Sequence, residues 1–317
     1  METAVTAVHQ LAEKLEKNMR SVIMGKDDVL RKVILCVLCD GHILLEDLPG
    51  TGKTTLAKAL AKSIDCAFRR MQFTPDLLPS DLTGINFFDR KQNEFVFKPG
   101  PVFTNILLGD EINRATPRTQ SSLLECMEER QVTVDGVTHA LERPFFVIAT
   151  QNPVEIQGTF PLPEAQLDRF FMRLSMGYPD KAFESAMLAG KQENDPMQTL
   201  PCAVTREELI AAQETIRKVR VSEAVRGYLV DIAHATRVDP RIRMGISPRG
   251  TLALMRAAQA YAAVNERDYV LPDDVKAVCA DVTAHRLLCR GRSLAQGNSL
   301  AAEVIGHILD EVRVPIE

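Results

Sequence analysis

The sequence predicts an α/β protein in which helices sandwich a parallel five-stranded sheet and a helical domain follows. Five short, nearly all-apolar runs in the first half are separated by helical patterns, as expected for parallel strands buried on both faces. From about residue 180 the apolar runs stop and helix-spaced patterns continue. We therefore expect an α/β core over residues 1–180 and an all-helical domain over 181–317.

The predicted strands are short and carry few polar residues. They are HILLE (42–46), FRRMQF (68–73), ILLGDE (106–111), FFVIAT (145–150) and FFMRLSM (170–176). Two other segments look like additions to the sheet. Residues 87–100 have a polar centre between aromatic flanks, and residues 130–142 alternate around Asp135-Gly136, a strong turn signal. Both are predicted to form hairpins.

Helix-start signals mark the C-terminal region. Thr205 and Glu208 form a capping-box pattern, and Ser247 precedes Pro248 at a first helical position. The predicted helices cover residues 205–219, a segment that begins near Ser222, and residues 247–264, 272–288 and 299–312.

The composition favours a folded protein that does not grip nucleic acid. The 317 residues are 45% hydrophobic and 25% charged, enough for a large core. The net charge is -4, whereas proteins that bind nucleic-acid phosphates usually carry a basic excess. We see no secretory signal, no run long enough to span a membrane and no disulfide pattern among the seven cysteines. A cytoplasmic protein is expected.

The loop after the first predicted strand is a candidate phosphate-binding loop. Its sequence LEDLPGTGKTTL fits G-x-x-x-x-G-K-[ST], except that Asp47 holds the first glycine position. Gly50 and Gly52 permit the backbone angles that aim N–H groups at phosphates. Lys53 can reach the β- and γ-phosphates, and the Thr54 hydroxyl can bind Mg²⁺ at a helix N-terminus. Taken alone, the loop is also compatible with a glycine-rich turn that a Lys-Thr pair follows by chance.

Polar residues follow two later strands. Asp110 and Glu111 end the third apolar run, and Asn152 follows the fourth. The carboxyl ends of parallel strands meet at one edge of a sheet, so we expect all three beside the candidate loop. Asp110 is placed to hold Mg²⁺ through water, Glu111 to orient the attacking water, and Asn152 to reach the γ-phosphate or that water. Each is common in isolation, but together with the loop they predict ATP and Mg²⁺ as cofactors.

At this point the chain resembles the AAA+ ATPases and, within them, the MoxR family, from about residue 20 to the C-terminus. The family often carries Asp at the position of Asp47. The resemblance implies a P-loop core with a helical lid domain and a homo-oligomeric ring, expected to be a hexamer. It rests on LLEDLPGTGKTTLAKALA, FTPDLLPSDLTG, FKPGPVFTNILLGDEINRATPRTQSSLLECMEE, FFVIATQNPVEIQGTFPLPEAQLDRFF and GISPRGTLALMRAAQAYA.

The resemblance also implies roles for single residues. Asp110 and Glu111 match Walker B, and Asn152 matches sensor 1. Arg169 matches the arginine finger that completes a neighbouring subunit's site, and Arg249 matches sensor 2, with action in cis or in trans left open. Residues 87–100 look like the helix-2 insert and 130–142 like the hairpin before sensor 1, while the role of Arg114 stays open. The nucleotide-binding residues are Pro49, Gly50, Thr51, Gly52, Lys53, Thr54 and Thr55, with Gly25 near the adenine.

The expected function is ATP-driven, chaperone-like maturation, assembly or cofactor insertion of other proteins. MoxR-like proteins often have partners with a von Willebrand factor A domain, so such a partner is expected. One alternative is the motor subunit of a metal chelatase, which a companion subunit that binds a tetrapyrrole would identify. A nucleic-acid motor is disfavoured, because the 131–140 hairpin carries Asp135 and no Lys or Arg at its tip. A scaffold that barely hydrolyses ATP is disfavoured by the presence of Glu111, Asn152 and Arg169.

Overall fold

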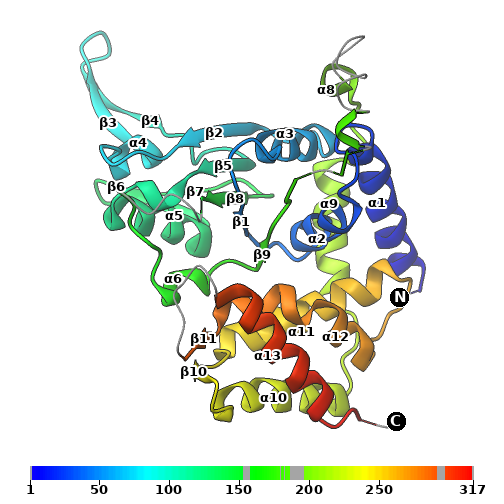
Figure 1. The fold of residues 1–317 in the computed structure, drawn as a ribbon. Coiled ribbons are helices and arrows are strands. Elements are labelled where there is room, and N and C mark those ends of the chain that lie inside the picture. The colour runs from blue at the N-terminus through cyan, green and yellow to red at the C-terminus, as the bar shows by residue number, and fades with distance from the viewer. Residues whose placement is uncertain are drawn as a thin grey trace.

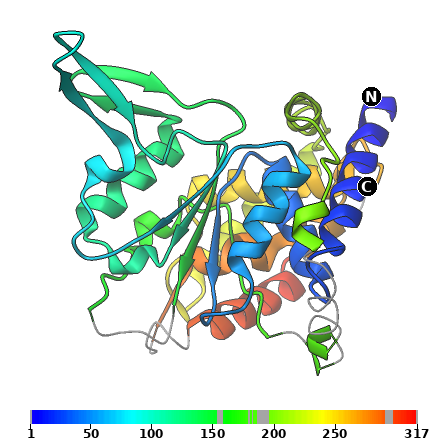
Figure 2. The same cartoon turned by 90° about the horizontal axis from the view of Figure 1, so that it is seen from above.

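A computed structural model describes residues 2–152, 158–178, 180–181, 183–185, 196–290 and 297–315. These residues form a twisted sheet with helices on both faces, a helical region next to it, and a hairpin that projects far from the body (Figures 1 and 2). Among them, we find no helix whose length and apolar character would let it cross a membrane.

The central sheet has five strands, and every neighbouring pair runs parallel. All five strands lie within the apolar runs predicted from the sequence or one residue beyond them, which confirms the α/β class. In spatial order they are β2 (Phe68–Gln72), β5 (Ile106–Asp110), β8 (Phe146–Gln151), β1 (Ile43–Glu46) and β9 (Met172–Leu174).

Alternation along the strands divides the core into two layers. Ile43 and Leu45 of β1 pack with helices α2 (Asp27–Leu38) and α3 (Lys53–Ser63) on one face. Leu44, between them in sequence, packs on the other face with α5 (Pro117–Glu129). Successive strand side chains point to opposite faces, so a fully apolar strand serves both layers.

Two antiparallel hairpins extend the core. The first is β3 (Gly84–Asp89) with β4 (Glu94–Pro99), after the short helix α4 (Pro79–Thr83), and it begins three residues before the predicted insert. The second is β6 (Gln131–Val134) with β7 (Val137–Ala140). Its two turn residues have φ of 49° and 81°, as a two-residue type I′ turn requires.

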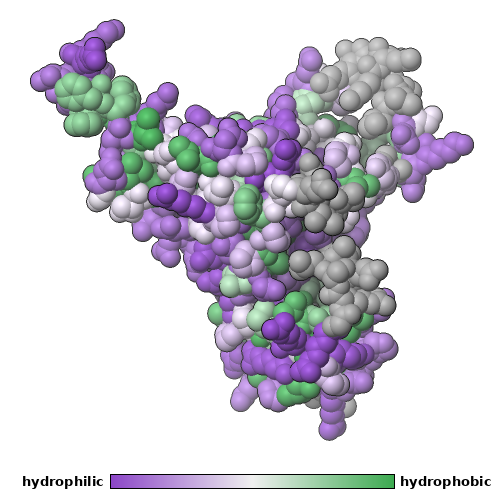
Figure 3. Space-filling model, turned by 60° about the vertical axis from the view of Figure 1, so that its left-hand side comes forward, coloured by the Kyte–Doolittle hydropathy of each residue, from purple (hydrophilic) through white to green (hydrophobic). Residues whose placement is uncertain are grey.

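The two hairpins contact each other. The Asn86 side-chain amide donates to the Asp135 carboxylate at 2.9 Å, and the Phe97 ring stacks on His139 with centroids 4.0 Å apart. Beyond this contact Phe88 and Phe95 pack edge to face and stay exposed, Phe95 by 73%. Figure 3 shows this apolar cluster below the hydrophilic tip of the projecting hairpin. Two inserts that are distant in sequence are therefore joined.

The described residues of the C-terminal region are helical apart from one short strand pair. Thr205, Ser222 and Ser247 each accept a hydrogen bond from a backbone N–H in the first turn of the following helix. The sequence patterns predicted the caps at Thr205 and Ser247, and for Ser222 they predicted only that a helix begins nearby. The pair β10 (Ile242–Met244) and β11 (Leu288–Cys289) was not predicted. The helices are α8 (Pro196–Thr199), α9 (Arg206–Ile216), α10 (Glu223–Val238), α11 (Pro248–Val264), α12 (Pro272–Thr283), η2 (Ala284–Arg286) and α13 (Gly297–Glu311).

The N-terminal helix and a buried ion pair both help to fasten the helical region to the core. The N-terminal helix α1 (Glu2–Arg20) packs against α9 and α11 as well as α2 and α3. Arg286 of η2 is buried and donates to the Asp168 carboxylate at 2.8 Å and to the Phe170 carbonyl at 2.6 Å. Asp168 lies after α6 (Glu164–Leu167), just before β9 begins. Burial lowers the pKa of Arg286, and the Asp168 charge opposes this shift, so the guanidinium depends on that carboxylate.

We predict that Asp168→Ala lowers the free energy of unfolding by about 3–5 kcal/mol, because it leaves a buried guanidinium without its counter-charge. Asp28→Ala is the control, since the Asp28 side chain is 78% exposed beside Lys32, and it should cost less than about 1 kcal/mol. Urea unfolding followed by circular dichroism measures both. Equal losses in the two variants would contradict the assigned role of the buried pair.

Candidate functional site

The candidate phosphate loop connects β1 to α3, in the strand-turn-helix context that the sequence predicted. Gly50 and Gly52 have φ of 84° and 94°, in the left-handed region that favours glycine. A Cβ added at Gly50 would meet no atom within 4 Å, so backbone conformation, and not crowding, requires glycine there. The open loop and the α3 N-terminus, with Thr54 and Thr55 in its first turn, fit a polyphosphate.

Lys53, the first residue of α3, points back into this loop. Its ammonium group donates to the backbone carbonyls of Asp47 at 2.9 Å and Leu48 at 3.2 Å. These neutral carbonyls carry no counter-charge, so the positive charge of Lys53 can attract an anion that approaches the loop.

Asp47 has a role of its own that the loop motif did not indicate. The side chain is 5% exposed, and its carboxylate accepts three hydrogen bonds from the segment that follows β9. The donors are the Ser175 hydroxyl at 2.8 Å, the Met176 N–H at 2.6 Å and the Gly177 N–H at 3.0 Å. Asp47 therefore binds the phosphate loop to residues 175–177, which we call the exit segment.

Tyr178, the residue after the exit segment, contacts the region predicted to lie near the adenine. The Lys26 ammonium group donates to the Tyr178 carbonyl at 2.7 Å. A Cβ added at Gly25 would come within 2.4 Å of the Phe183 ring, and Gly25 has φ of 70°. Gly25 is therefore required both by its backbone and by the ring against it. One continuous set of contacts joins Gly25, the exit segment and the phosphate loop.

The predicted carboxylates lie at the same sheet edge. Asp110 ends β5, and the Thr150 hydroxyl of neighbouring β8 donates to its Oδ1 at 2.7 Å. Arg70 of β2 donates to Oδ2 at 2.6 Å, so the Asp110 carboxylate is paired in the free chain. The same Thr150 hydroxyl accepts the Glu111 N–H at 2.8 Å. Thr150 and Arg70 thus orient this pair, and sequence reasoning singled out neither.

Glu111 is held in a tight local geometry. Its φ of 57° is unusual for a residue other than glycine, and such strain is often found at functional sites. Its carboxylate accepts from the Gln72 amide at 2.7 Å and from Arg114 at 3.2 Å. Arg114, for which the sequence suggested no role, therefore lies beside Glu111. Asn152 directly follows β8. The residue before it, Gln151, accepts a hydrogen bond on its carbonyl from the Asp47 N–H at 3.2 Å, so Asn152 lies next to Asp47.

The two predicted arginines lie at the opposite sheet edge. Met172, which begins β9, pairs with Ile43, which begins β1, so Arg169 precedes the strands while the phosphate loop follows them. The four residues of β1 alone separate the two edges by about 13 Å. Arg249 lies close to Arg169, since the guanidiniums of both pair with the carboxylate of Glu128 near the end of α5. Neither arginine contacts its own chain's phosphate loop in this arrangement.

Comparisons with known proteins agree with this geometry. Residues 42–172 match the model of the ATPase family associated with various cellular activities (AAA), and residues 234–305 match the AAA lid domain. Chaperone MoxR1 of Mycobacterium tuberculosis is 37% identical over 97% of this chain and 83% of its own length. The chain belongs to the MoxR family of AAA+ ATPases. Nucleotide binding follows from that membership.

Two further relatives extend the likeness over the whole length of this MoxR-family chain. The uncharacterised protein YeaC of Bacillus subtilis is 46% identical over 98% of this chain and 97% of its own. A crystal structure from Cytophaga hutchinsonii, described as a candidate ATPase, superposes with a TM-score of 0.91 at 37% identity, covering 99% of this chain and 98% of that one. The AAA+ core and lid are therefore shared in full.

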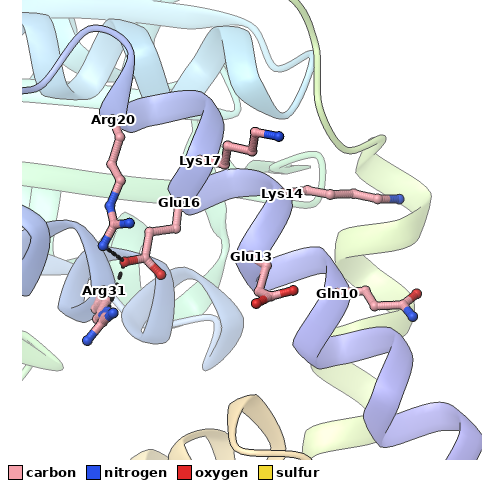
Figure 4. A pocket seen from close by; sticks show the side chains of 7 residues that line it. All are labelled: Gln10, Glu13, Lys14, Glu16, Lys17, Arg20 and Arg31. Atoms are coloured by element: carbon pink, nitrogen blue, oxygen red, sulfur yellow. Dashed lines mark hydrogen bonds and ion pairs between the residues drawn. The ribbon is translucent and has the colours of Figure 1, made fainter.

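A large hollow elsewhere on this MoxR-family protein is a charged surface groove. It measures about 600 Å³ and runs along α1, with Arg31 contributed by α2. In Figure 4, Arg20 and Arg31 converge on the Glu16 carboxylate, at 2.6 and 2.8 Å, while Lys14 and Lys17 point away from it. Four cationic and two anionic side chains line it, and none of them belongs to the phosphate loop or to the strand ends beside it, so we assign the groove no part in the nucleotide site. The lining residues are Gln10, Glu13, Lys14, Glu16, Lys17, Arg20 and Arg31.

We predict that Asp47→Gly, which restores the usual loop motif, destabilises this protein although it improves the match to the pattern. The change leaves the buried N–H of Met176 and the half-buried N–H of Gly177 without their acceptor, and an unsatisfied buried donor costs about 1–3 kcal/mol. Asp47→Asn keeps one acceptor oxygen and is the control, with a smaller loss. Thermal unfolding of both variants measures the difference. A glycine variant as stable as the parent would mean that the three hydrogen bonds contribute nothing.

Proposed function

We propose that this protein hydrolyses ATP with Mg²⁺ at the boundaries between subunits of a ring, expected to be hexameric. The observation that carries the proposal is the division of the site between two sheet edges. Lys53, Asp110 and Glu111 gather at the carboxyl edge, while Arg169 and Arg249 lie at the amino edge. A second copy that presents its amino edge to this carboxyl edge would complete the constellation.

Each residue of the carboxyl edge has a task in this proposal. The loop N–H groups, Lys53 and the α3 N-terminus bind the phosphates, with Pro49, Thr51 and Thr55 shaping the turn and Gly25 beside the base. Thr54 and Asp110 would hold Mg²⁺, which would neutralise charge on the phosphate oxygens. Glu111 orients the attacking water and polarises it, once it leaves Gln72 and Arg114. Asn152 fixes the water or the γ-phosphate from the neighbouring strand.

The arginines act from the neighbouring subunit. Hydrolysis builds negative charge on the transferred phosphoryl group, and a guanidinium supplies permanent positive charge in a rigid fork. Arg169 is the finger in this proposal, and Arg249 acts in trans beside it, because both share one carboxylate. Hydrolysis then depends on assembly.

We further propose that the cycle drives chaperone-like maturation or cofactor insertion of a partner protein, including one with a von Willebrand factor A domain. The naming of the Mycobacterium relative as a chaperone supports this. The projecting hairpin exposes Phe88 and Phe95, and its tip carries Asp89 and Glu94 against Arg90 and Lys91. A charge-balanced aromatic tip suits a protein partner better than a nucleic acid, which needs a basic groove.

Glu111→Gln should bind ATP with unchanged affinity and lose at least about 100-fold in turnover, since the amide cannot accept a proton from water. Phosphate release and calorimetric titration with ATP measure the two quantities. Wild-type turnover in this variant would remove Glu111 from its role. The same variant, held in ATP and used as bait, captures the partner, and a tetrapyrrole-binding companion among the captured proteins would point to a chelatase motor.

Mixing Arg169→Ala subunits with Lys53→Ala subunits should restore part of the activity that each lacks alone. Each boundary that pairs an intact loop with an intact finger regains the full set of charges, worth about 10³-fold or more in rate for a finger arginine. Co-assembly is checked by differential tagging. Absence of rescue in rings shown to contain both variants would contradict a site shared between subunits.

A further inference from the structure

Glu128 makes a contact that the nucleotide site does not explain. Its Oε2 pairs with the Arg169 Nε at 3.2 Å, and its Oε1 pairs with the Arg249 guanidinium. One carboxylate therefore takes one arginine on each oxygen. The arginines come from segments that are 80 positions apart in sequence, and Glu128 comes from α5 in the core. The contact is a meeting point of the core and the helical domain.

The Glu128 carboxylate is the counter-charge of both Arg169 and Arg249, because the nearby Asp168 carboxylate is already engaged by other groups. The nearby Asp168 carboxylate accepts from Arg286 on one oxygen and from the Ser247 hydroxyl on the other. Arg286 repels both Arg169 and Arg249, because all three side chains are positively charged. With Glu128 as the partner of two guanidiniums, the three groups alone keep a net charge of about +1. Glu125 and Glu129 nearby add two negative charges, so an anion would be attracted by direct contact with the guanidiniums and not by the net charge of the surroundings.

The three groups remain accessible from outside. The side chains of Arg169, Glu128 and Arg249 are exposed by 32%, 34% and 46%. A hollow of about 480 Å³ lies next to them, and Arg169 and Glu128 form part of its wall. An exposed ion pair is weak and exchanges readily with a stronger anion. The other lining residues are Ser121, Glu125, Glu129, Gln131 and Gln166.

We propose that Glu128 is a positioning residue that stands in for the terminal phosphate of the ATP bound in the neighbouring subunit. Arginine recognises carboxylate and phosphate with the same planar, two-pronged geometry. Glu128 holds both guanidiniums together before assembly and releases them when the neighbour's triphosphate, which carries more charge, arrives. It competes with the nucleotide, so it raises the ATP concentration needed for half-maximal rate without taking part in the reaction.

This inference rests on the proposed function, since it requires Arg169 and Arg249 to act in trans. The expected effect of removing the competitor is a lower KM with kcat unchanged. A fall in KM of about three- to tenfold is expected, because two exposed pairs compete only modestly, and tenfold corresponds to about 1.4 kcal/mol.

The test compares Glu128→Gln with Glu125→Gln in steady-state ATP hydrolysis by the full chain. Both changes neutralise one glutamate of α5 that lines the same hollow, but Glu125 takes part in none of the ion pairs found among the described residues. Protein concentrations are set so that light scattering gives the same assembly for all variants. The proposal predicts a lower KM in Glu128→Gln alone, with kcat within twofold of the parent.

Two results would overturn the proposal, and a third would overturn the function beneath it. An unchanged KM in a correctly assembled Glu128→Gln ring would show that Glu128 does not compete. A lower kcat would show that Glu128 aligns the arginines during the reaction itself. Absence of ATP hydrolysis in the parent protein would instead remove the proposed function.

Discussion

The common direction of the five strands is the constraint on which the rest of this molecule depends. In a parallel sheet every loop that follows a strand emerges at one edge, and every loop that precedes a strand enters at the other. The phosphate loop, Asp110 and Asn152 all follow strands, whereas Arg169 precedes β9. The fold therefore places the phosphate loop and the polar strand ends beside it at one edge of the sheet. It places the arginine that is proposed to complete the site at the other edge of the same sheet. A rigid sheet keeps these two sets of groups apart within one chain, which is the geometric basis for the proposal that a second copy completes the site.

Buried polar contacts at both edges of the sheet hold elements on that frame. Arg286 pairs with Asp168 and so fixes η2 at the amino edge, beside the start of α11, where Ser247 also donates to Asp168 at 2.8 Å. At the other edge, Asp47 holds the exit segment on the phosphate loop. The chain between β9 and the helical domain therefore starts from the nucleotide loop, while the domain itself rests on the opposite edge.

The extent to which sequence predicts these features depends on whether a residue's role is local. The five strands, the Asp135-Gly136 turn and the helix caps depend on neighbours within a few positions, and the pattern showed them. Strands β10 and β11 span three and two residues, too short for any alternation to register. Asp47 was noted as a departure from the motif, but its partners lie some 130 positions away, and no local pattern points to them. The sharing of Glu128 by Arg169 and Arg249 was not predicted for the same reason, because it is a tertiary contact between residues that are distant in sequence.

The contacts of Glu111 lie close in the chain to the insert that carries the projecting hairpin. Gln72, which binds the Glu111 carboxylate, is the last residue of β2. The chain runs from there through α4 into the projecting hairpin, which the Asn86–Asp135 contact joins to the second hairpin. The second hairpin follows α5 directly, and α5 carries Glu128. Both hairpins are therefore rooted in elements that touch charged groups of the site, one at each edge of the sheet. In the proposed function, a rearrangement of either Glu111 or Glu128 would reach the same pair of joined hairpins, which would link the two half-sites of each chain to one surface.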